Sequence, residues 1–300
     1  MKPLFAREGL MILESLSFTR TLYAFDFDGT LSKIVRVPGD ATLSRTTESL
    51  LVELAGLAPV AVISGRSIDD LKPRLKFKPH FLVGNHGLEG LEGGQGAMTR
   101  ARSACLGWKK TLDKVDWPHG VEIEDKTYSL AIHFRRSRNK KTAKVLIRDS
   151  IEALSPSPRI IAGKSVLNLL PAGAPHKGIA LMEIMKSAGF RNAFYIGDDD
   201  TDEDVFSLQD EGRLMTVRVG KKRSSNARYF IARQSEINRL LKELIRHHRP
   251  GCLVSSARCA DRSRPPPRTR PPDRTAREAM STAPGLGRTG GTAAHPNAPC

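Results

Sequence analysis

Long apolar runs are missing from this chain. No window approaches the roughly 20 apolar residues that a membrane-spanning helix needs. The first twenty residues interrupt their apolar positions with Arg7, Glu8, Glu14 and Arg20, whereas a signal peptide needs an unbroken apolar segment. We therefore expect a cytoplasmic protein that has no membrane partner.

Cysteine is also scarce. Only Cys105 lies in the part of the chain that we expect to fold, because Cys252, Cys259 and Cys300 fall in the last fifty residues. No pair has the CxxC spacing, so the sequence excludes a disulfide framework and a cysteine-based metal site. We expect Cys105 to be an ordinary buried or half-buried thiol.

Lysine is absent from the segment 250–300, although the chain as a whole has a formal charge of +16. Eight arginines stand there against three acidic residues, which gives +5 of the total. Proline clusters and the lack of hydrophobic periodicity predict a disordered Arg/Pro-rich tail. Two interpretations are open for it: an arm for nucleic acid, or a solvated extension without function. Nucleic acid is expected as a partner only through this tail, and we expect a monomer.

Short apolar runs alternate with helical patterns before residue 250. Ser44 precedes one helical pattern as an N-cap residue, and Gly189 ends another. Repeated strand, helix, strand order predicts an α/β fold with a doubly wound, Rossmann-like parallel sheet, whose ligands bind at the carboxyl ends of the strands. The predicted strands are 22–27, 60–63, 81–83, 193–196 and 215–219.

The middle of the chain has a different order. Two strands follow one another directly at 120–125 and 128–135, and again at 158–163 and 165–171, with a helical pattern at 140–154 between the pairs. Strands in direct succession favour antiparallel pairing. We therefore predict an inserted α+β cap domain. The predicted boundaries are a first core segment at 1–92, the cap at 93–172, a second core segment at 173–249 and the tail at 250–300.

Two aspartates end the first predicted strand, in the stretch YAFDFDGTLS. Asp26 and Asp28 project to the same side because side chains alternate along a strand, and Gly29 lets the chain turn. Carboxylates this close persist together when a cation lies between them, or when one is protonated and acts as an acid. The alternative for a bare DxD is that one aspartate caps a turn.

Three other strand ends or helix starts carry polar groups. The stretch 198–204 holds six carboxylates, which as clustered hard oxygen ligands favour Mg²⁺, although an acidic loop capping the next helix explains Glu203 and Asp204. Ser64 and Gly65 offer a hydroxyl and N–H groups to an anion. Lys177 begins a helix, where a cation needs a partner or a function. Together these groups predict phosphoryl transfer.

The sequence resembles the haloacid dehalogenase superfamily of phosphatases in four motifs. DxDGT is found at 26–30, and Ser64, Lys177 and the group Gly197, Asp198 and Asp202 supply the other three. The stretches GNHGLE (84–89), EDKTYSLAIHFR (124–135) and GKSVLNLLPAGAPHKG (163–178) are similar to trehalose-6-phosphate phosphatases. This second resemblance implies a cap that binds sugar and a core that handles phosphate.

The resemblance also implies roles for individual residues. The catalytic set is Asp26 as nucleophile and Asp28 as acid and base, with Ser64 and Lys177 stabilising the phosphoryl oxygens. The Mg²⁺ ligands are Asp26, Asp28 through its backbone carbonyl, Asp198 and Asp202. Substrate binding is expected from Ser64, Gly65, Arg66, Glu124, Lys126, Arg135, Lys164 and Asn168.

Two positions depart from the family pattern. Asn168 stands where the family usually has glutamate, and Leu170 stands where a basic residue commonly precedes the proline. The expected reaction is Mg²⁺-dependent hydrolysis of trehalose 6-phosphate through an aspartyl-phosphate. Asn168 keeps open a related phosphatase acting on glucosylglycerol or mannosylglycerate phosphate, and a third alternative is a non-catalytic sugar-phosphate sensor. We expect His86 to lie in a turn or hinge and His133 to be structural.

Overall fold

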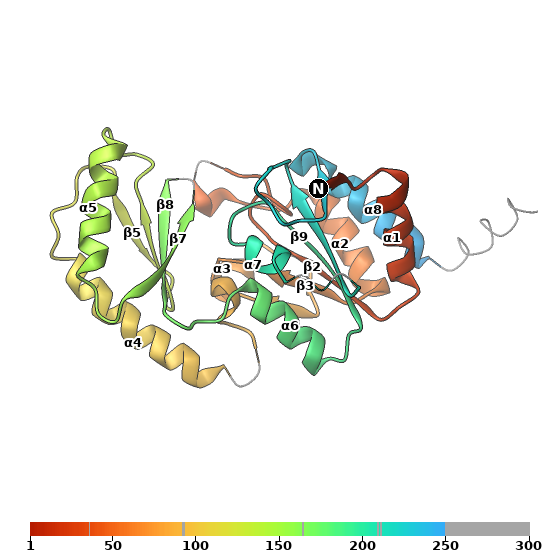
Figure 1. Cartoon of the computed structure of the whole chain (residues 1–300), viewed down its shortest axis with the longest axis horizontal. Coiled ribbons are helices and arrows are strands. Elements are labelled where there is room, and N and C mark those ends of the chain that lie inside the picture. The colour runs from red at the N-terminus through yellow and green to blue at the C-terminus, as the bar shows by residue number, and fades with distance from the viewer. Residues whose placement is uncertain (36, 92–93, 164, 209, 211, 250–300) are drawn as a thin grey trace, which may run out of the picture. The chain divides into compact units, whose positions relative to one another are not determined.

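The computed structural model describes residues 1–35, 37–91, 94–163, 165–208, 210 and 212–249 (Figure 1). The predicted tail at 250–300 lies outside these residues. Within them, two separate sheets account for the strands.

A seven-stranded sheet forms the larger part of the fold. Its strand order is β1-β11-β10-β9-β2-β3-β4, and all neighbouring strands run parallel. The chain adds β3 and β4 on one side of β2 and later adds β9 to β11 on the other, so the order reverses at β2. The strands are β1 (Lys2–Pro3), β2 (Thr21–Phe25), β3 (Val60–Ile63), β4 (Phe81–Val83), β9 (Asn192–Gly197), β10 (Leu214–Val219) and β11 (Tyr229–Ile231).

Helices cover both faces of this sheet because its central strands are apolar on both sides. Tyr23 and Phe25 of β2 pack into a core with α1, α2 and α8, while Leu22 and Ala24 face a second core with α6 and α7. None of the helices in the described part of the chain is long and apolar enough to span a membrane. The helices are α1 (Arg7–Ser17), α2 (Arg45–Leu57), α3 (Ile68–Leu71), α6 (Lys177–Ser187), α7 (Glu203–Phe206) and α8 (Ile237–His248), with 3₁₀ turns η1 (Pro38–Asp40), η2 (Asn85–Gly87) and η3 (Gln234–Glu236).

The five predicted strands are all present, and each observed boundary lies within two residues of its prediction. Ser44 caps α2 as predicted, because its Oγ accepts a hydrogen bond of 3.1 Å from the backbone N–H of Thr47. Gly189 follows α6 with a left-handed φ of 67°, a conformation that suits glycine. The sequence patterns did not predict α1, α8, β1 or β11.

A second sheet of four antiparallel strands, ordered β5-β6-β8-β7, forms the predicted cap fold. Figure 1 shows α4 and α5 beside it, and the buried Trp108 and Cys105 of α4 lie in the core between helices and sheet. The predicted α/β class with an α+β cap is therefore confirmed, while the boundaries at 92 and 172 stay predictions. The elements are α4 (Gln95–Leu112), β5 (Glu122–Asp125), β6 (Leu130–His133), α5 (Lys140–Glu152), β7 (Pro158–Gly163) and β8 (Val166–Pro171).

Candidate functional site

Three neighbouring strands of the large sheet end in polar residues. Asp26 follows β2, Asp198 follows β9 and Ser64 follows β3. Phe25 pairs with Ile196 on one side and with Val62 on the other, so these three strand ends are side by side. The strand order reverses at β2, which is where open parallel sheets bind ligands.

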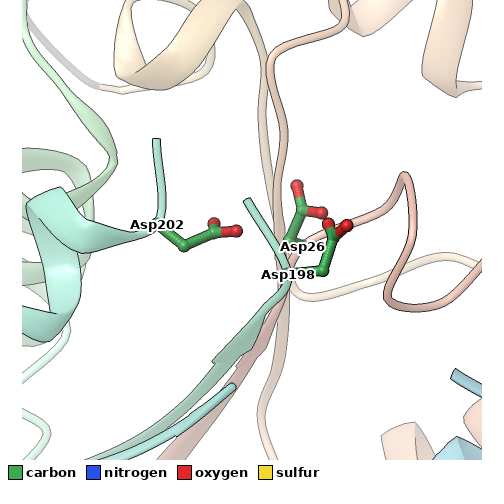
Figure 2. A group of neighbouring side chains, drawn as sticks. All are labelled: Asp26, Asp198 and Asp202. Atoms are coloured by element: carbon green, nitrogen blue, oxygen red, sulfur yellow. The ribbon is translucent and has the colours of Figure 1, made fainter. Parts of the chain in front are cut away.

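The carboxylates of Asp26, Asp198 and Asp202 form one acidic group. Each offers an oxygen atom, and these three atoms all lie within 4.8 Å of one another. Figure 2 shows the carboxylate of Asp202 directed toward the other two. The carboxylates of Asp198 and Asp202 lie so close to the backbone that two positions need glycine. A Cβ at Gly29 would lie 2.2 Å from Oδ2 of Asp198, and one at Gly197 would lie 2.1 Å from Cγ of Asp202.

Lys177 supplies a positive charge to this group. It is the first residue of α6 and is 2% exposed. Its Nζ donates hydrogen bonds of 2.8 Å to Oδ1 of Asp26 and 2.8 Å to Oδ1 of Asp202. Lys177 was expected to need a partner because it begins a helix, and it has two, Asp26 and Asp202.

One ammonium group does not neutralise three carboxylates. Burial, partly offset by Lys177, raises the pKa of Asp26 well above its usual range. Partial burial and the charges of Asp199 and Asp202 raise the pKa of Asp198 to about 8. Although burial alone would lower the pKa of Lys177, Asp202 and Asp26 raise it well above the ordinary value. With a single ammonium group for three carboxyl groups, the site favours protonation of Asp26 and Asp198 in place of the missing positive charge.

Of the other acids of the stretch 198–204, Asp199 lines a cavity, Asp200 pairs with Lys222, and the last two pair with arginines. Glu203 pairs with Arg218 at 3.0 Å, and Asp204 pairs with Arg159 of β7 at 2.9 Å. Both lie in the first turn of α7, as the capping explanation predicted. The acidic stretch therefore divides into residues that face the site and residues that anchor the loop.

Asp28 does not join the acidic group through its carboxylate. Nε and Nη2 of Arg66 donate to its two carboxylate oxygens at 2.5 and 2.7 Å, and Nη1 of Arg66 donates to Asp70 at 2.5 Å. The Asp28 side chain is 43% exposed and faces a cavity. The prediction that its backbone carbonyl binds a metal stays a prediction.

Ser64, Gly65 and His86 lie together at the end of β3. Ser64 is 1% exposed and its Oγ accepts a hydrogen bond of 3.2 Å from the N–H of Arg66. The imidazole of His86 lies against Gly65, where an added Cβ would be 2.4 Å from Cε1. His86 is 6% exposed, and its Nδ1 has no hydrogen-bond partner among the described residues. Burial and the charges of Lys177 and Lys126 lower its pKa to about 3, so the imidazole is neutral.

Residues of both the core and the cap line a cavity of about 770 Å³. This volume is in the range of small-molecule binding sites. Nε2 of His133 lies 2.8 Å from Oε2 of Glu124, and this hydrogen bond lowers the pKa of Glu124. Lys164 lies outside the described residues. The predicted residues that line the cavity are Asp26, Asp28, Ser64, Gly65, Arg66, Glu124, Lys126, Arg135, Asn168 and Lys177.

Sequence analysis missed two residues of this region. His86 was expected only to shape a turn, yet it lines the cavity. Asn85 was given no role, yet it is fully buried beside the site. The available signal was the position of this polar pair between Gly84 and Gly87, directly after a strand end, in a stretch that the family resemblance had already marked.

A family model described as trehalose-phosphatase matches residues 24–235, well over half of the chain. The chain belongs to the trehalose-phosphatase family. Trehalose-phosphate phosphatase B of Arabidopsis thaliana is 30% identical over 243 residues, which cover 73% of this chain and 65% of that protein. The chain spans about two thirds of the length of the plant relatives that it matches.

Solved structures of related proteins share the fold. The C-terminal domain of the C. albicans trehalose-6-phosphate phosphatase is 20% identical, with a TM-score of 0.62, and the match covers 82% of this chain and 98% of that one. A trehalose-6-phosphate phosphatase related protein is 24% identical, with a TM-score of 0.57, over 75% of this chain and 96% of that one. At these identities the likeness establishes the family's fold for this chain.

Replacing Lys177 by methionine is expected to destabilise the fold strongly. Lys177→Met keeps a similar length but leaves Asp26 and Asp202 buried without their cation, a loss of about 3–5 kcal/mol in the free energy of unfolding. Urea denaturation at neutral pH in the presence of a chelator measures this. Lys186→Met makes the same change on the exposed face of α6 and should alter stability by less than about 0.5 kcal/mol. Equal effects of the two substitutions would contradict the assigned ion pairs.

Removing His86 is expected to flatten the pH dependence of stability. Below pH 6.5 the unfolded chain protonates this histidine, while folded His86 stays neutral until about pH 3. Stability is therefore lost as the pH falls below 6.5, by up to about 1.4 kcal/mol per pH unit. His86→Asn, which tolerates the φ of 59°, should lose this component between pH 6.5 and 5.

The measurement is urea denaturation at several pH values in that window, with chelator present. The exposed His119 provides the control, since His119→Asn should keep the wild-type slope. If His86→Asn also keeps that slope, the neutral buried imidazole is wrong.

Proposed function

We propose that this protein hydrolyses trehalose 6-phosphate to trehalose and inorganic phosphate. The observation that carries the proposal is a single cavity lined both by Asp26 and Lys177 and by the cap residues Glu124, Lys126 and Arg135. Family membership and the names of the relatives point to the same substrate class. Chemistry for phosphate and hydrogen-bonding groups for a sugar are thus present in one site.

Asp26 is the proposed nucleophile. Its carboxylate attacks phosphorus, the bond from phosphorus to the sugar oxygen breaks, and Asp28 protonates that oxygen. A water molecule then attacks the aspartyl-phosphate, Asp28 takes its proton, and the carboxylate of Asp26 is regenerated together with phosphate. Lys177 holds Oδ1 of Asp26 at 2.8 Å, which fixes the orientation of the carboxylate.

Ser64 and Gly65 are proposed to contact the phosphoryl oxygens. Both line the cavity at the end of β3, and the Ser64 hydroxyl and the Gly65 N–H are donors of the kind that stabilise developing negative charge. For Arg66 the geometry favours a contact with Asp28 over direct substrate binding, because its guanidinium already bonds two carboxylates. Arg66 would then hold the Asp28 carboxylate at the cavity wall, and Asp28 would act as an acid after it takes up a proton and this pairing loosens.

The acidic group fits a divalent cation such as Mg²⁺. Oδ1 of Asp198 is buried without a hydrogen-bond partner in the described part of the chain, and a cation beside it would replace the protons that the raised pKa values of Asp26 and Asp198 favour. Asp26, Asp198 and Asp202 would hold the ion through hard oxygen ligands. When bound, the ion would reduce the repulsion between the Asp26 carboxylate and an anionic phosphate.

The cap is proposed to select the sugar. Glu124 accepts hydrogen bonds from hydroxyl groups, while Lys126 and Arg135 donate them. Asn168 faces the same cavity and is shorter and uncharged compared with the glutamate of the family pattern. This difference favours one second candidate, a phosphatase for another glycosyl phosphate such as glucosylglycerol or mannosylglycerate phosphate.

A substrate panel tests the proposed function. Purified protein should release phosphate from trehalose 6-phosphate at least about tenfold faster, in kcat/KM, than from glucose 6-phosphate, glucosylglycerol phosphate or mannosylglycerate phosphate. Chelation should abolish the activity, and added Mg²⁺ should restore it, because the acidic group then regains its counter-charge. A preference for another glycosyl phosphate would establish the second candidate, and no phosphate release from any of them would refute phosphatase function.

Removal of the nucleophile should stop turnover. Asp26→Asn keeps the shape of the side chain but cannot form an aspartyl-phosphate, so kcat should fall by at least about a thousandfold. Circular dichroism should show an unchanged fold. Asp113→Asn makes the same change at the end of α4 and should keep wild-type activity. Turnover of Asp26→Asn within about tenfold of wild type would rule out Asp26 as nucleophile.

A further inference from the structure

Asn85 connects the end of β3 to the cap hairpin that bears Glu124 and Lys126. Its Nδ2 donates a hydrogen bond of 3.2 Å to the carbonyl of Lys126, and its Oδ1 accepts one of 2.8 Å from Oγ of Ser129. The side chain is fully buried. Both ends of the amide group bond to the loop between β5 and β6, and the side chain also bonds to Glu89.

The backbone of Asn85 and His86 is hydrogen-bonded to the residues that follow β3, where phosphate is proposed to bind. The N–H of Asn85 donates to the carbonyl of Arg66 at 2.8 Å, and the N–H of His86 donates to the carbonyl of Ser64 at 3.0 Å. Asn85 has a left-handed φ of 46°, a conformation that asparagine tolerates better than most residues. A strained conformation held by several bonds is typical of a functional position.

The cap loop that Asn85 contacts is itself tightly constrained. The N–H of Lys126 bonds to the carbonyl of Ser129 at 3.0 Å, and the N–H of Tyr128 bonds to the carbonyl of Lys126 at 2.8 Å. Thr127 donates its N–H to Asp125 at 2.8 Å. Because the loop is constrained in this way, fixing it also fixes Glu124 and Lys126 at the cavity.

We propose that Asn85 is a positioning residue that sets the separation between the sugar-binding hairpin and the phosphate-binding segment at Ser64 and Gly65. It thereby determines which leaving groups reach Asp28 while their phosphate lies beside Asp26. The inference rests on the proposed phosphatase function. It assigns a specificity role to a residue that is expected to touch neither the sugar nor the phosphate.

The experiment compares a sugar phosphate with an aryl phosphate that makes no sugar contacts. Asn85→Gly removes the side-chain hydrogen bonds to Lys126 and Ser129 together with the one to Glu89, and glycine adopts the left-handed φ without cost. It should lower kcat/KM for trehalose 6-phosphate at least about tenfold, while kcat/KM for p-nitrophenyl phosphate stays within about threefold of wild type. Asn226→Gly changes another hydrogen-bonded loop asparagine and should affect neither substrate.

A double-mutant cycle separates positioning from general damage. Ser129→Ala removes one of the two cap contacts and should give a smaller loss on trehalose 6-phosphate. In the Asn85→Gly background it should cause no further loss beyond about twofold, because Ser129 acts through Asn85. Equal losses on both substrates, no loss on either, or independent effects of the two substitutions would each overturn the proposal. Failure of the wild type to release phosphate from trehalose 6-phosphate would instead refute the proposed function.

Discussion

The paired hydrogen bonds from Lys177 to Asp26 and Asp202 are the interaction on which the site depends. Buried carboxylates repel one another and lose hydration, and a fully buried ammonium group would be equally unfavourable alone. Together they are tolerated, and the two bonds of 2.8 Å fix α6 against the end of β2 and the start of α7. Because one ammonium group stands beside three carboxyl groups, the same arrangement that stabilises the fold leaves the site able to accept a second cation in place of protons.

The parallel sheet explains how residues so distant in sequence reach one point. Asp26 and Lys177 are 151 positions apart, yet each stands at an element terminus beside β2, where the strand order reverses. Gly29 and Gly197 let the carboxylates approach within contact distance of the backbone. An alanine at either position would separate the acidic group, so the two glycines belong to the site as much as its charged residues do.

Sequence reasoning located the strand ends well because apolar runs followed by Asp, Ser or Gly are local patterns. It did not find Asn85 or His86, whose importance comes from contacts with the cap loop and with Gly65. It also passed over α8, although Leu240, Leu241 and Leu244 have the helical spacing of a buried face. Arg66 was predicted to bind substrate, and its pairing with Asp28 depends on a side-chain orientation that no sequence pattern indicates.

In the proposed reaction, the large sheet supplies the groups that act on phosphate and the cap sheet supplies the groups that contact the sugar. Phosphate chemistry uses groups at the ends of β2, β3 and β9, whereas Glu124, Ala131 and Asn168 form one cross-strand row on β5, β6 and β8. Ala131, the residue between Glu124 and Asn168 in this row, is small, and the shorter amide of Asn168 leaves this part of the cavity wider than a glutamate would. A change at Asn168 can therefore alter the accepted sugar without disturbing Asp26 or Lys177. Such independence is possible only if the cap hairpin is held at a fixed distance from the phosphate site, which is the constraint that the buried amide of Asn85 supplies.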